Sequence, residues 1–135
     1  MIALIFAILA LSALIYAASF GGVSGRWFAL ICLSAYALTI LAELVGQPWT
    51  GAHWPVILVD ALCFLAMLTL ALTSDRHFTL WIAAFQLNTV ITHLVNTVTP
   101  EITPALYARA SAIWSILILL IGVIGVAIDR RKGLR

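Results

Sequence analysis

The chain has 135 residues, of which 64% are hydrophobic and 9% are charged. In soluble domains about a quarter of the residues are charged, so this composition indicates an integral membrane protein. The formal net charge of +2 is too small to indicate binding to nucleic acid. The two cysteines, Cys32 and Cys63, lie inside apolar segments without zinc-type or CxxC spacing, and we interpret them as small core residues.

Five apolar segments follow one another, each long enough to cross a hydrocarbon core of about 30 Å. They predict a single all-α domain, a transmembrane bundle with helices over residues 2–19, 26–45, 55–73, 78–98 and 104–128. No basic stretch precedes the first segment, which therefore reads as a transmembrane helix and not as a signal peptide. The glycine-rich residues 21–25 predict a turn, and Trp27 and Phe28 then resemble anchors at the membrane surface.

Turn signals separate the later segments. Residues 46–55 combine glycines, prolines and two tryptophans, as expected of a loop at a membrane surface, and Pro55 can open the third helix. Residues 74–77 form a short polar turn before the fourth helix. Thr103 and Pro104 are a cap and a first-turn proline, so they open the fifth helix.

The placement of basic residues predicts the orientation in the membrane. Four of the seven Lys and Arg residues follow the fifth helix, so the C-terminus is expected in the cytoplasm. Five spans then place the N-terminus outside. Arg26 and Arg76 fall near the two turns that this topology also places inside.

The fourth helix carries a polar stripe on an otherwise apolar surface. At roughly 100° per residue, one third of its circumference collects five polar side chains, namely Gln86, Thr89, His93, Asn96 and Thr97. Lipid offers polar groups no hydrogen-bonding partner. The stripe is therefore expected to face the bundle, a ligand or another protein.

The ionisable residues within the predicted spans share one depth. Glu43, Asp60, His93 and Arg109 each lie about five residues or fewer from the outer end of a helix, within the outermost ~8 Å of the hydrocarbon. With Gln86 and Asn96 they form the candidate site for binding or proton handling. A charge at this depth needs a partner, so Asp60 and Arg109 are expected to form an ion pair across helices three and five. A carboxylate, from Glu43 or Asp60, is also expected to approach His93.

His93 admits three interpretations. It is a hydrogen-bonded histidine of the bundle, a proton relay beside a carboxylate, or an axial ligand of haem or a chlorin. Haem normally takes a second ligand, and of the other histidines only His53 lies at the same end. No pair of candidate ligands has the spacing of a metal site, so none is predicted. No catalytic motif occurs, and the chain is not expected to be an enzyme.

One group of residues in helices three and four resembles a known pattern, namely Val59-Asp60, Ser74-Asp75-Arg76, Leu80-Trp81, Phe85-Gln86 and Thr92-His93-Leu94. It is similar to a pattern in small, uncharacterised multi-helix inner-membrane proteins of bacteria. The resemblance implies a multi-pass protein of a bacterial inner membrane, with Asp60, Gln86 and His93 as candidate site residues. It implies no particular reaction.

These observations favour a non-enzymatic membrane subunit that self-associates or docks on a larger membrane complex. Its partners would be the lipid bilayer and other membrane subunits, with the polar residues of the outer leaflet as the binding or docking site. One alternative is a membrane protein that binds haem, a chlorin or a quinone through His93. A second is an oligomeric conductor of protons or small ions.

Overall fold

A computed structural model of the chain describes residues 2–45, 54–99 and 104–133. Within helices, the side chains of residues 2, 3, 43, 45 and 104–111 are outside this description. The chain forms five helices, α1 (Ile2–Phe20), α2 (Gly22–Val45), α3 (Trp54–Thr73), α4 (His77–Val98) and α5 (Pro104–Arg131). No strand occurs in the described segments, so the expected all-α fold is confirmed.

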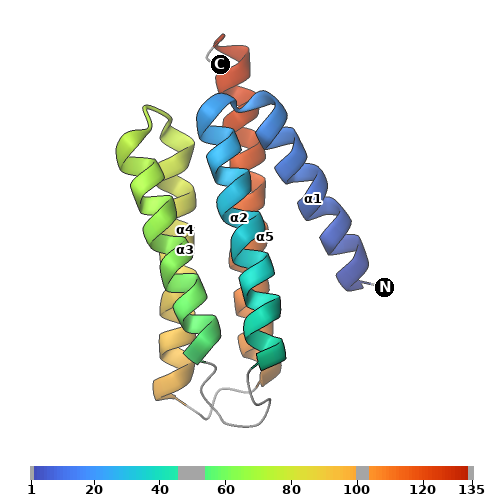
Figure 1. Ribbon diagram of the computed structural model, residues 1–135, viewed down its shortest axis with the longest axis vertical. Coiled ribbons are helices and arrows are strands. Elements are labelled where there is room, and N and C mark those ends of the chain that lie inside the picture. Colours follow the sequence, from blue (N-terminus) through green and yellow to red (C-terminus); the bar gives the residue numbers. More distant parts are fainter. Residues whose placement is uncertain (1, 46–53, 100–103, 134–135) are drawn as a thin grey trace.

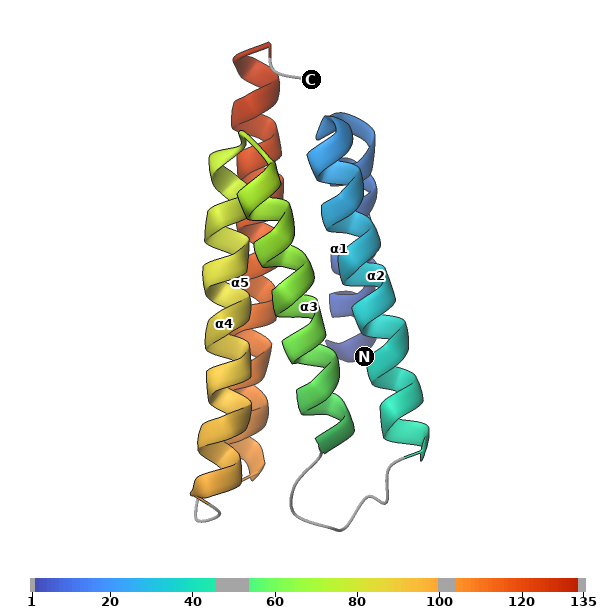
Figure 2. The ribbon, with the colours of Figure 1, turned by 60° about the vertical axis from the view of Figure 1, so that its left-hand side comes forward.

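The helices form a ring in which successive helices run antiparallel, whereas α1 and α5 run parallel to each other (Figures 1 and 2). Each helix packs against the next one along the chain, and α5 packs against α1 to close the ring. The α1–α2 corner, the α3–α4 turn and the end of α5 all lie at one end of the bundle, which we call the basic end. Away from this end, α1 diverges from the other helices towards its N-terminus (Figure 1).

Among the described residues, four helical stretches are long and apolar enough to cross a membrane, namely Gly22–Ala42, Trp54–Thr73, His77–Val98 and Ala112–Arg131. α1 has a shorter apolar stretch, Leu4–Phe20. These lengths and the many exposed leucine and isoleucine side chains support the membrane-protein interpretation.

The predicted turn over residues 21–25 is too long. The structure has only a corner at Gly21 and Gly22, because α2 begins at Gly22. Gly22 makes the corner with a φ of 61°, a conformation that glycine adopts without steric cost. Gly25 lies inside α2, and a Cβ atom on it would overlap the carbonyl oxygen of Ala17 in α1. The glycines therefore serve close packing of α1 against α2 as well as the corner itself.

Two phenylalanines fill the centre of the bundle near the basic end. The rings of Phe28 (α2) and Phe78 (α4) meet edge to face with their centroids 6.5 Å apart. Each ring packs where α5 has a glycine, Phe28 against Gly122 and Phe78 against Gly125. A Cβ atom on either glycine would overlap the facing phenylalanine, so both positions serve close packing.

Phe28 is not a surface anchor, contrary to the expectation from its sequence position. Its side chain is 1% exposed, while that of Trp27 is 53% exposed and remains a candidate anchor. The reason is tertiary, because the missing side chain of Gly122 opens the space that the Phe28 ring fills.

Filling one of these spaces should destabilise the bundle. Gly125→Leu should lower the free energy of unfolding by about 1–3 kcal/mol, because the new side chain overlaps Phe78. Denaturant titration in detergent micelles, followed by circular dichroism, measures this change. Ala84→Leu adds the same kind of side chain at an exposed position of α4 and should have little effect. Equal losses for both variants would contradict the packing account.

Candidate functional site

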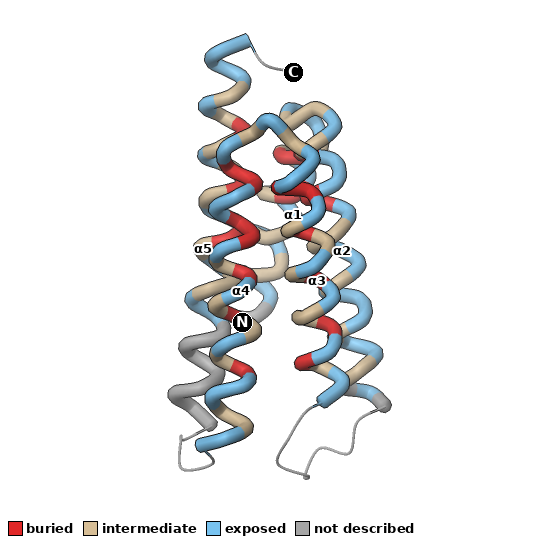
Figure 3. Tube along the Cα trace, turned by 90° about the vertical axis from the view of Figure 1, so that its left-hand side faces the viewer, coloured by how far each residue is buried: buried red, intermediate tan, exposed pale blue. Residues whose placement is uncertain are grey.

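The polar stripe of α4 faces the inside of the bundle. Gln86, Thr89 and His93 are buried, and Asn96 and Thr97 are half-buried. Figure 3 shows buried positions recurring along α4. The prediction that this face looks into the bundle is confirmed for Gln86, Thr89 and His93. The buried side of α4 is turned towards α3 and α5, the two helices against which it packs.

Asp60 of α3 lies between two members of this stripe. His93 Nε2 is 2.6 Å from Asp60 Oδ2. Gln86 Nε2 donates to Asp60 Oδ1 over 3.1 Å and lies 3.4 Å from the backbone oxygen of Asp60. Gln86 and His93 are seven residues apart, about two helical turns, so both contact α3 from one face of α4. We call Asp60, Gln86 and His93 the polar cluster.

The cluster satisfies the carboxylate of Asp60 from within the protein. Both of its oxygens have a nitrogen partner on α4. The His93 side chain is 5% exposed and that of Asp60 is 18% exposed. A carboxylate in such apolar surroundings is costly without partners. The expected approach of a carboxylate to His93 is confirmed for Asp60, whose Oδ2 lies within hydrogen-bonding distance of Nε2.

Other candidates from the sequence are placed only in part. The side chains of Glu43 and Arg109 are outside the described part of the chain, as is His53. The ion pair between Asp60 and Arg109 therefore stays a prediction. In the described part, the ionic partner of Asp60 is His93.

The contact with Asp60 limits how His93 could bind haem. Nε2, one of the two ring nitrogens that can ligate iron, is engaged by Asp60. Ligation through Nε2 would require the Asp60 contact to break. Among the described residues, no three His, Cys, Asp or Glu side chains gather in a way that could hold a metal ion.

A hydrogen bond between α4 and α5 was not predicted from the sequence. Trp114 Nε1 donates to Thr92 Oγ1 over 3.0 Å, and its ring lies 6.0 Å from that of Phe85. A tryptophan inside an apolar helix needs an acceptor for its N–H group, which is the signal that sequence reasoning could have used. With the polar cluster, this bond connects α4 to both of its neighbours.

A second set of polar contacts, also not predicted, joins helices at the basic end. Ser24 Oγ of α2 lies 2.8 Å from Ser74 Oγ, and Ser74 Oγ accepts from the backbone N–H of Arg76. Arg76 Nη1 in turn lies 3.4 Å from Asp129 Oδ2 of α5. We call these contacts the end latch. In the sequence, the sign of these contacts was Asp129, an acidic residue at the start of the basic C-terminal tail.

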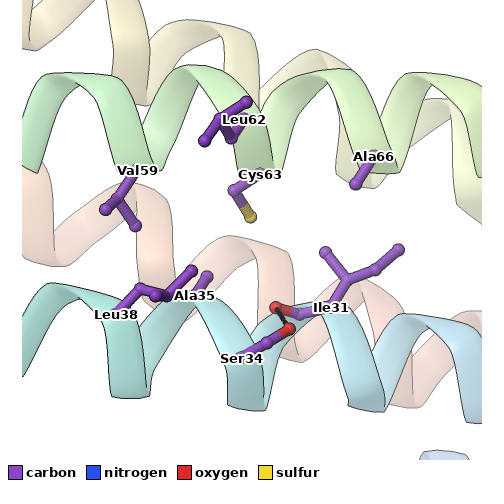
Figure 4. A pocket seen from close by; sticks show the side chains of 8 residues that line it. All are labelled: Ile31, Ser34, Ala35, Leu38, Val59, Leu62, Cys63 and Ala66. Atoms are coloured by element: carbon purple, nitrogen blue, oxygen red, sulfur yellow. Dashed lines mark hydrogen bonds between the residues drawn. The ribbon is translucent and has the colours of Figure 1, made fainter.

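A groove of about 180 Å³ lies between α2 and α3. Figure 4 shows its side chains, which are apolar or small, with the sulfur of Cys63 directed towards α2. The Ser34 hydroxyl in its wall donates to backbone carbonyls of its own helix. The groove therefore adds no hydrogen-bonding group that suits a polar ligand.

The coupling between Asp60 and His93 can be measured. A double-mutant cycle with Asp60→Ala and His93→Ala should give a coupling free energy of about 0.5–3 kcal/mol, because each change removes the same contact. Unfolding in detergent micelles supplies the four free energies. The control cycle uses Ser12→Ala and Thr69→Val, exposed hydroxyls that bond only within their own helices, and should be additive. Additive losses of unfolding free energy at Asp60 and His93 would show that their contact does not stabilise the protein.

Comparison of the chain with known protein families, with curated proteins and with solved structures finds no match.

Proposed function

We propose that this chain is a non-enzymatic subunit of a membrane assembly, with the polar cluster as its functional centre. The observation that carries the proposal is the contact between His93 and Asp60 inside an otherwise apolar bundle. Ionisable residues within membrane spans are costly and typically mark sites of binding or proton exchange. The cluster works through hydrogen bonding and proton exchange, without a bound metal.

The proposed location is a bacterial inner membrane, with the N-terminus outside and the C-terminus in the cytoplasm. The basic end supports this orientation, because it gathers the described side chains Arg26, Arg76, Arg130, Arg131 and Lys132. The polar cluster lies in the opposite half of the bundle and hence in the outer leaflet. The bacterial origin rests on the resemblance in helices three and four.

Two features support association with another membrane protein or with a second copy. The first half of α1 diverges from the bundle and exposes large apolar side chains such as Ile5 and Ile8. Asp60 keeps part of its side chain exposed at the edge of the polar cluster. A hydrogen-bond donor of a partner would reach the cluster at this edge.

The His93–Asp60 pair also supports a second proposal, proton conduction by an oligomer. An imidazole and a carboxylate within hydrogen-bonding distance can pass a proton between them. A chain of this size encloses no wide path by itself, so several copies would be needed. Binding of haem or a quinone remains the third proposal, and a visible absorption spectrum of the purified protein tests the haem part directly.

The orientation has a simple test. Cysteines introduced at Thr50 and Lys132, in a chain with Cys32 and Cys63 replaced by alanine, should react with an impermeant thiol reagent from opposite sides of the membrane. Thr50 should label in intact cells, and Lys132 only after the membrane is opened. Labelling of both from one side would show that the number of spans or the orientation is wrong.

The docking role of the polar cluster is tested by the size of the assembly. In mild detergent the wild-type protein should migrate as a complex larger than the monomer, and His93→Gln should shift most of it to the monomer. Helix content by circular dichroism checks that the variant is folded. Thr69→Val, an exposed change on α3, serves as the control. An unchanged complex with folded His93→Gln would contradict the docking role.

A further inference from the structure

The basic end carries a surplus of positive charge that the protein does not neutralise. Its described side chains comprise five basic residues and two acidic ones, Asp75 and Asp129. Arg76 pairs with Asp129 in the end latch. The remaining basic side chains are exposed, and in the described part of the chain none makes an ion pair: Arg26, Arg130, Arg131 and Lys132.

One of these charges lies on an aromatic surface that continues along α1. The guanidinium carbon of Arg130 is 4.2 Å from the centre of the Phe20 ring, within the range of a cation–π contact. Phe20 itself is 42% exposed and packs against Tyr16 with the two rings tilted and their centroids 5.1 Å apart. At about 100° per residue, Leu9 and Ile5 lie on the same side of α1 as Phe20, and they continue the exposed apolar surface away from the basic end.

We propose that this surface binds an anionic phospholipid. The phosphate contacts Arg130, with Arg131 and Lys132 beside it in the chain, and an acyl chain lies along Phe20, Tyr16 and the exposed side of α1. The inference rests on the proposed membrane location and adds a ligand at the end opposite the polar cluster.

The combination of basic and apolar side chains on this surface favours a phospholipid as the ligand. A free phosphate ion would use the charges but leave the aromatic and apolar side chains of α1 without a partner. A phospholipid satisfies both parts, because its head is charged and its chains are apolar. Basic residues at a membrane surface attract anionic lipid by about 1 kcal/mol each, so several neighbouring charges give a clear preference over a zwitterionic lipid.

Native mass spectrometry of the full chain in detergent tests the proposal with phosphatidylglycerol and phosphatidylcholine of identical acyl chains. The wild-type protein should prefer phosphatidylglycerol. The triple variant Arg130→Gln, Arg131→Gln, Lys132→Gln should lose this preference by roughly fivefold for each charge removed. The matched variant Arg130→Lys, Arg131→Lys keeps the charges and should keep most of the preference.

A second pair of variants tests the aromatic surface. Phe20→Ala should weaken phosphatidylglycerol binding several-fold, whereas Trp81→Ala, which removes an exposed aromatic residue of α4, should not. Equal binding of the two lipids by the wild type, or equal losses in Phe20→Ala and Trp81→Ala, would overturn the proposal. Displacement of the lipid by an equal concentration of inorganic phosphate would also overturn it.

The failure of this inference can be distinguished from failure of the proposed membrane location. Purified protein is reconstituted into vesicles of phosphatidylcholine alone and floated on a density gradient. Protein that floats with these vesicles but shows no lipid preference contradicts only the anionic-lipid site. Protein that does not float contradicts the membrane location itself.

Discussion

The contact between Asp60 and His93 sets the register of α3 against α4. A carboxylate in an apolar bundle needs hydrogen-bonding partners, and leaving one without them costs several kcal/mol. Here the partners are His93 at 2.6 Å and Gln86 at 3.1 Å, both on one face of α4. A shift of α3 by one helical turn, about 5.4 Å, would separate Asp60 from these partners. The polar cluster therefore acts as a positional constraint on the fold as well as a candidate site.

The rest of the bundle divides its stabilising interactions between two halves. Near the basic end, apolar packing dominates, with Phe28 and Phe78 packed against the glycines of α5. The polar contacts of the end latch join α2, the α3–α4 turn and α5 at the same end. In the other half, buried polar groups connect the helices. The two halves suit different tasks, because tight apolar packing keeps the helices together while the polar half retains groups that can exchange a proton or bind a partner.

Sequence patterns predicted what depends on one helix at a time. The five helices, the inward face of α4 and the common depth of Asp60 and His93 follow from hydropathy, periodicity and rise per residue. Depth says nothing about rotation around each helix axis, so it could not decide between Glu43 and Asp60 as the carboxylate beside His93. The burial of Phe28 and the early start of α2 depend on glycines that pack against another helix. Such relations exist only in the folded bundle.

The most direct measurement of the central claim is the nitrogen-15 resonance of His93 in lipid bilayers. With labelled histidine, the His93 signals are identified by their loss in His93→Gln. The account predicts that Asp60→Asn moves the Nε2 resonance of His93 strongly, because that nitrogen loses its carboxylate partner, and leaves the signals of His53 and His77 in place. A His93 Nε2 resonance that is the same with aspartate and with asparagine at position 60 would contradict it.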